Sequence, residues 1–174
     1  MNVYRNSQKR VYLPGVPVFI TANTFNRFEY FREDIFCQLL VEEMNFAREA
    51  KKYDLMAYKI IPDHIHLIIQ PDGEEYNYSQ IMHFIKRQTS RNANLIMDEA
   101  TDLQTGKLFP YIKILRKQFI IKHGNKNPYP PFKWQKSFHS HLITTNEELN
   151  RIKKYIIHQK EKHNLKENTY LYIK

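Results

Sequence analysis

The chain of 174 residues is 42% hydrophobic and 26% charged, as expected for one ordinary soluble globular domain. Its single cysteine, Cys37, excludes an internal disulfide framework and a cysteine-based zinc site, and no apolar run approaches the roughly 18 residues of a membrane span. The first residues lack the apolar core of a signal peptide, so we expect a cytoplasmic protein with no membrane partner.

Positive charge is concentrated in one segment of the chain. Lys and Arg total 27 against 18 Asp and Glu, which gives a net charge of +9. The segment from Leu103 to Asn146 contains eight basic residues and no acidic one, and aromatic residues are interleaved with them. Such a block favours a nucleic-acid surface, because cations neutralise phosphates and rings stack on unpaired bases. A solvated basic face, a membrane surface and an acidic protein partner are the alternatives.

Hydrophobic periodicity predicts seven elements. In chain order we expect a strand at 16–25, a helix at 34–52, strands at 55–61 and from 64, a helix from 79, a strand at 137–143 and a helix from 145 to about 162. Asp34, Ser79 and Thr145 are the expected N-caps, and Pro62-Asp63 makes a tight break between two strands. This order is the split βαβ pattern of an α+β fold, a ferredoxin-like antiparallel sheet with helices on one face plus a C-terminal helix. We treat residues 1–174 as one domain with a basic insertion at about 99–133, which could form a hairpin or a short helix.

Two histidines in an apolar run are the first candidate site. His64 and His66 are separated by one residue, so on a strand their side chains point to the same face. Two imidazoles on a rigid strand could bind a metal together, but they could also be hydrogen-bonded core residues. The side chain of the adjacent Asp63 is expected to face away from that of His64 if the strand is regular.

The second helix and the basic segment supply candidate DNA contacts. Lys86, Ser90 and Asn94 recur every four residues, so they share a helix face that could follow a phosphate backbone or simply face solvent. The candidate DNA-binding residues are Lys86, Arg87, Arg91, Lys113, Arg116, Lys117, Lys122, Lys133 and Trp134.

The final helix carries a tyrosine at the edge of its apolar stripe. Leu149, Ile152 and Ile156 mark the buried side, and Tyr155 lies beside it. Gln159 follows one turn later on the face of Tyr155. Taken alone, such a tyrosine is usually a half-buried packing residue and such a glutamine is usually solvated.

Four segments of the chain, in order, resemble one protein family. The run from Ile61 to Leu67 looks like the HUH motif (His, bulky apolar residue, His) of single-tyrosine transposases. The second helix also resembles that of the family. The run from Trp134 to His139 is similar to the Trp-Gln stretch before the last helix of REP-associated tyrosine transposases, and Lys154 to Gln159 matches the position of the catalytic tyrosine. The resemblance covers nearly all of residues 18–165.

This resemblance implies cleavage and rejoining of single-stranded DNA at hairpin-associated sites, through a covalent 5′-phosphotyrosine on Tyr155. It implies Mg²⁺ or Mn²⁺ held by His64, His66 and Gln159, although two imidazoles ordinarily suggest zinc or another transition ion. The implied partner is single-stranded DNA with a hairpin, and we expect a monomer or homodimer. Gln159 looks like the third ligand of insertion-sequence relatives, whereas many REP-associated members have an Asn-Pro-Val turn that is absent here.

Two other classes of function stay open. A non-catalytic DNA- or RNA-binding module would explain the basic segment, and it could be a transposase that has lost activity. A nuclease that uses metal-activated water would need no tyrosine. Tyr76 and Tyr78, just after the histidine strand, are competing nucleophiles.

Overall fold

An antiparallel sheet forms the centre of the structure. The computed structural model describes residues 10–73, 75–98, 109–124, 127–165 and 170–174. Within these residues five strands lie in the order β4-β1-β3-β2-β5, and each neighbouring pair is antiparallel. Their bounds are β1 Val18–Asn23, β2 Tyr53–Ile61, β3 His64–Pro71, β4 His139–Leu142 and β5 Leu171–Ile173.

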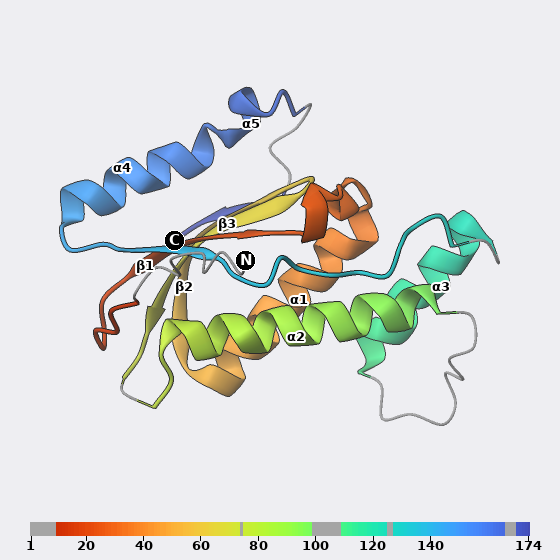
Figure 1. Cartoon of the computed structure of the whole chain (residues 1–174), viewed down its shortest axis with the longest axis horizontal. Helices are drawn as coiled ribbons and strands as arrows, with labels where there is room; N and C mark the ends of the chain where they lie inside the picture. Colours follow the sequence, from red (N-terminus) through yellow and green to blue (C-terminus); the bar gives the residue numbers. More distant parts are fainter. Residues whose placement is uncertain (1–9, 74, 99–108, 125–126, 166–169) are drawn as a thin grey trace, which may run out of the picture.

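Helices cover both faces of this sheet (Figure 1). On one side lie α1 (Asp34–Lys51), α2 (Tyr78–Met97) and α3 (Pro110–His123). On the other side lie α4 (Asn146–Ile157) and the short α5 (Gln159–Lys162). The predicted α+β class with an antiparallel sheet is therefore confirmed, and the C-terminal helix takes the face opposite the other long helices.

Alternation along β3 divides its side chains between two apolar cores. Ile65, Leu67 and Ile69 belong to the large core under α1 and α2. Ile68 belongs to a smaller core with Ile156 of α4. Because side chains of a strand alternate, the histidines of β3 share the face of Ile68 and point toward α4. Ile61 pairs with His64 across the β2–β3 hairpin, so the predicted tight break is a two-residue turn.

Two of the three predicted helix caps are wrong. The residue before α1 is Glu33 instead of Asp34, and its side chain makes no capping bond. Asn77 caps α2 in place of Ser79, because its side chain accepts from the backbone N–H of residues 79 and 80 while Gln80 returns a bond to Asn77. The third prediction is confirmed: Thr145 accepts a bond from the Glu148 backbone and starts α4.

The described part of the predicted insertion contains one helix. Of the two predicted alternatives, a hairpin or a short helix, the structure has the helix α3, which starts with Pro110 at a position where its missing N–H is harmless. Residues 99–108 and 125–126 of the predicted insertion lie outside the described residues. The predicted last helix is interrupted at His158, and the edge strand β5 was not predicted. Within the described part of the chain, no helix is both long and apolar enough to span a membrane.

Candidate active site

The two histidines of β3 face each other through the same ring nitrogen. His64 Nε2 lies 3.3 Å from His66 Nε2, and the two residues are only 5% and 4% exposed. Burial lowers the pKa of both imidazoles, that of His66 to about 3. Both rings are therefore neutral at physiological pH, the form in which histidine binds a metal.

The opposite ring nitrogens contact different neighbours. His66 Nδ1 lies 2.9 Å from the Thr21 hydroxyl on β1. His64 Nδ1 lies 2.5 Å from Asp63 Oδ1, and because a carboxylate only accepts, His64 donates through Nδ1 and keeps the lone pair on Nε2. The expectation that Asp63 faces away from His64 is thus wrong, because Asp63 belongs to the β2–β3 turn and not to a regular strand.

Gln159 brings an amide to the same place from α5. Its side chain is 1% exposed, and its Nε2 donates to the Tyr155 backbone oxygen at 3.0 Å. Tyr155, whose backbone oxygen it contacts, lies with its ring against His66. The Gln159 Oε1 atom is buried without a hydrogen-bond partner, although buried polar atoms are rarely left unpaired. An unpaired amide oxygen and two facing imidazole nitrogens fit a three-ligand metal site.

No cluster of conventional ligands competes with this arrangement. Among the described residues, no group of three or more His, Cys, Asp or Glu side chains could hold a metal ion. A metal on the histidine pair would therefore need the Gln159 amide, with water or substrate oxygens completing its coordination.

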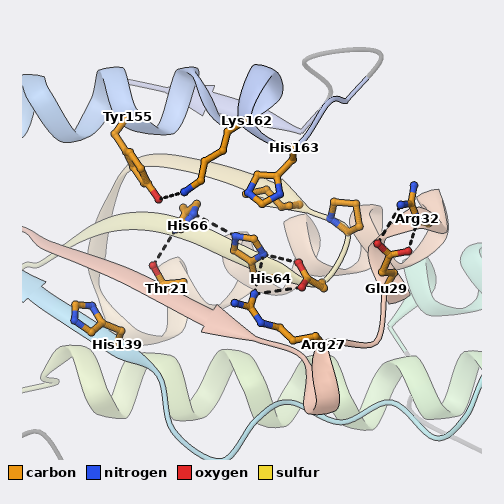
Figure 2. A pocket seen from close by; sticks show the side chains of 13 residues that line it. Thr21, Arg27, Glu29, Arg32, His64, His66, His139, Tyr155, Lys162 and His163 are labelled. Carbon is orange, nitrogen blue, oxygen red and sulfur yellow. Dashed lines mark hydrogen bonds and ion pairs between the residues drawn. The ribbon is translucent and has the colours of Figure 1, made fainter.

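Tyr155 lies directly against the histidine pair. Its ring centroid is 5.3 Å from that of His66 and 6.0 Å from that of Phe19. Ile152 and Ile156 anchor α4 in the small core, which leaves Tyr155 40% exposed at the predicted edge of the stripe. Lys162 of α5 reaches back so that its Nζ lies 3.5 Å from the Tyr155 hydroxyl (Figure 2).

His64, His66 and Tyr155 line one cavity of about 710 Å³, which we call the histidine cavity, whereas Gln159 is not among its lining residues. Its walls include three cations that the sequence analysis did not single out: Arg27, Arg32 and Lys162 (Figure 2). Arg27 and Arg32 come from two short 3₁₀ turns, η1 (Phe25–Arg27) and η2 (Tyr30–Arg32), that follow β1. Hydrophobic periodicity does not identify a functional cation in such a turn. The only available signal in the sequence is that both arginines follow shortly after the first predicted strand.

The face of α2 that carries Lys86 and Asn94 packs against another part of the protein instead of facing solvent. Lys86 Nζ donates to the backbone oxygens of Gln135 at 2.6 Å and Lys136 at 3.2 Å, and burial lowers the pKa of Lys86 to about 8. Asn94 exchanges two bonds with the Phe132 backbone. This face therefore holds the segment before β4, and Lys86 has a structural partner. Arg87 and Arg91 are exposed.

None of the other predicted DNA contacts lines the histidine cavity. Lys117 and Lys133 are exposed, Lys113 is half-buried, and Lys122 forms a 2.8 Å ion pair with Glu33. Two of the predicted contacts are buried. Arg116 is 4% exposed and donates to the Leu95 oxygen at 2.6 Å, while Trp134 is 9% exposed between aromatic rings of the large core. Both side chains therefore have partners within the protein.

The comparisons with known proteins agree with this geometry. The family described as "Transposase IS200 like" matches residues 18–111, a range that contains both histidines and ends before Tyr155. No curated protein matches the chain. A REP-associated tyrosine transposase bound to a REP hairpin has a similar structure, with a TM-score of 0.63 and 21% identity over 91% of this chain and 74% of that one. A Deinococcus radiodurans R1 protein described as a transposase matches with a TM-score of 0.48 and 14% sequence identity, over 90% of this chain and 97% of that one. Because the family model matches more than half of the sequence, this chain belongs to the IS200-like transposase family.

Proposed function

We propose that this transposase cleaves and rejoins single-stranded DNA through a covalent bond between Tyr155 and a 5′-phosphate. The observation that carries the proposal is the contact of the Tyr155 ring with His66, next to two facing imidazole nitrogens. A tyrosine used only for packing would not need a cation near its hydroxyl or a cavity in front of it. Here both are present.

The proposed reaction exchanges one phosphate ester for another. The Tyr155 oxygen bonds to phosphorus as the bond to the 3′-oxygen breaks, the phenol proton goes to solvent, and the departing 3′-oxygen takes up a proton. The ester bond energy is kept in the phosphotyrosine, so the reverse attack by a 3′-hydroxyl can join strands. Lys162 supports the developing negative charge on the phenol oxygen through its position 3.5 Å away.

His64, His66 and Gln159 would hold the divalent ion, for which we propose Mg²⁺ or Mn²⁺. When bound, the ion supplies a Lewis acid for a phosphate oxygen. Asp63 and Thr21 would fix the ring orientations through the Nδ1 atoms, as the partners of metal-binding histidines usually do. Burial keeps both rings neutral, which is the form in which an imidazole can offer a nitrogen to a metal.

We propose single-stranded DNA with a hairpin as the partner. The structurally similar tyrosine transposase is bound to a REP hairpin. In this chain, the cations of the histidine cavity could bind phosphates of one part of a folded DNA strand. The exposed cations on α2 and α3 could bind phosphates of another part, on the opposite side of the sheet.

The test is covalent capture. The protein is incubated with Mn²⁺ and labelled single strands that tile the DNA flanking its gene, hairpins included, and denaturing gels are searched for an adduct. We expect an adduct with the wild-type protein and none with Tyr155→Phe, which should still bind DNA. Mass spectrometry should place the nucleotide on the Tyr155 peptide.

Each alternative has its own result. Cleavage that survives Tyr155→Phe would indicate a nuclease using water. Binding without cleavage by the wild-type protein would indicate a DNA-binding module. An adduct on Tyr76 or Tyr78 would overturn the assignment of Tyr155.

A further inference from the structure

The turn after β1 is tied firmly to the turn that carries the histidines. Thr24 donates to the Asp63 backbone oxygen twice, from its backbone N–H at 2.9 Å and from its hydroxyl at 2.9 Å. The Arg27 backbone N–H donates in turn to the Thr24 oxygen at 3.2 Å. The position of the η1 turn is therefore fixed relative to His64.

Two consecutive residues of this turn have left-handed backbone conformations. Asn26 has φ 52° and Arg27 has φ 56°. Asn tolerates this region through its short polar side chain, but Arg has no such compensation. A residue with a Cβ in this region costs free energy, and such residues persist mainly where the surrounding structure or function requires them. Glycine would adopt the positive φ of residue 27 with less strain than arginine does.

The side chain of Arg27 enters the histidine cavity beside His64. Arg27 Nη1 lies 3.2 Å from Asp63 Oδ2 and 3.4 Å from His64 Nδ1, and the side chain is 58% exposed. Both contacts use Nη1, while a guanidinium has five N–H donors in a planar fork. An exposed ion pair of this kind stabilises a fold very little. Stability therefore does not explain an arginine on a strained backbone here.

We propose that Arg27 is a positioning residue that binds the phosphate next to the one attacked by Tyr155. Arg27 contacts His64 on its Nδ1 side, away from the facing Nε2 atoms, so we place its phosphate beside the attacked one and not at the Nε2 atoms. A neighbouring phosphate of the same strand would meet its free donors and fix the register of the strand. This inference rests on the proposed function for the identity of the ligand, a DNA strand in the histidine cavity.

The first measurement is thermal unfolding of Arg27→Gly. Relief of the left-handed strain should leave the melting temperature unchanged or raise it by about 2–4 °C, while a residue with only a structural role would lower it. Affinity for the captured single-stranded oligonucleotide should fall by about 10- to 100-fold, the usual range for lost charge-assisted hydrogen bonds. Arg48→Gln is the matched control, because Arg48 also faces an aspartate but lies on α1 outside the cavity.

The second measurement identifies the phosphate. Binding is measured in the Tyr155→Phe background with oligonucleotides in which one phosphate at a time is a neutral methylphosphonate. One position next to the cleavage site should weaken binding by about 10-fold with Arg27 present and by less than about 2-fold with Arg27→Gly. Equal losses with and without Arg27 at every position would overturn the proposal, and coupling at the attacked phosphate itself would overturn the placement. The coupling is read from binding alone, so an Arg27-dependent phosphate would still be found if no adduct formed, and in that case the proposed chemistry would fail while the phosphate contact of Arg27 stood.

Discussion

The two nitrogens of each candidate histidine have different neighbours. His64 and His66 each use Nδ1 for a residue outside the pair and turn Nε2 toward the other ring. Because His64 donates from Nδ1 to Asp63, its Nε2 carries a lone pair 3.3 Å from His66 Nε2. Without a metal, a neutral His66 can satisfy this contact by donating from Nε2 while its Nδ1 accepts from the Thr21 hydroxyl. A metal would instead require His66 to carry its proton on Nδ1, so that both Nε2 lone pairs are free.

At this scale we predict that His64→Ala, His66→Ala and Gln159→Ala each remove Mn²⁺-dependent cleavage by the transposase. Without DNA, Mn²⁺ at 100 times its dissociation constant should stabilise the wild-type protein by about 2.7 kcal/mol, and the variants should lose this effect. The measurement is thermal unfolding with and without Mn²⁺. His141→Ala serves as the control, because His141 is exposed and paired with Glu148 on the outer strand. An undiminished Mn²⁺ effect in the three variants would remove the metal assignment.

At the scale of elements, the sequence predicts what depends on local periodicity. The strand positions of His64 and His66, the helix that carries Tyr155 and the hairpin at Pro62-Asp63 all follow from patterns within about ten residues. These patterns and the family resemblance were enough to name His64, His66 and Tyr155, whose rings lie close together in the structure.

What the sequence could not predict depends on packing between distant segments. Arg116 and Trp134 look like DNA contacts in a basic segment, but α3 turns Arg116 toward the end of α2 and the large core encloses Trp134. Likewise, the spacing of Lys86 on its helix gives no sign that the backbone at 135–136 covers it. The position of Arg27 depends on a contact between two turns that lie far apart in the chain.

One prediction at this scale concerns the anchoring of α3. Glu33, 3% exposed before α1, accepts from Lys122 at 2.8 Å, from Tyr129 at 3.1 Å and contacts His123 at 2.9 Å. Burial raises the pKa of Glu33, but the bonds from Lys122 and His123 outweigh it, so the pKa lies below its usual value. Because the folded pKa is depressed, the stabilisation is complete above the unfolded pKa and is lost as the pH falls through the folded one.

Accordingly, Glu33→Gln should lower the free energy of unfolding at neutral pH by roughly 1–3 kcal/mol. The difference from the wild-type protein should shrink as the pH falls through the lowered pKa of the carboxylate, where it becomes protonated. Urea unfolding at neutral pH and over a series of acidic pH values measures both effects. Glu29→Gln provides the comparison, since the Glu29–Arg32 pair is exposed on both sides and should contribute little. A pH-independent difference for Glu33→Gln would show that the carboxylate charge is not what holds α3.

At the scale of the whole molecule, two groups of cations lie on different sides of the sheet. The cations of the histidine cavity accompany Tyr155 on the α4 side of the sheet. Arg87, Arg91 and Lys117 are exposed on α2 and α3, which lie on the other side (Figure 1). A short single strand of DNA could bind in the histidine cavity alone. A longer strand with a hairpin could bind in the cavity through its unpaired part and contact the surface of α2 and α3 through the hairpin.

This division predicts that the two regions respond differently to the length of the DNA. Changing Arg87, Arg91 and Lys117 to Gln should reduce the slope of log affinity against log salt by about 0.7–0.9 for each lost phosphate contact, but only with DNA that carries a hairpin. With a short unpaired oligonucleotide the slope should match that of the wild-type protein. Fluorescence anisotropy at several salt concentrations measures both slopes. If the slope for hairpin DNA does not change, the exposed cations of α2 and α3 are solvated residues, and the hairpin must bind on the α4 side of the sheet.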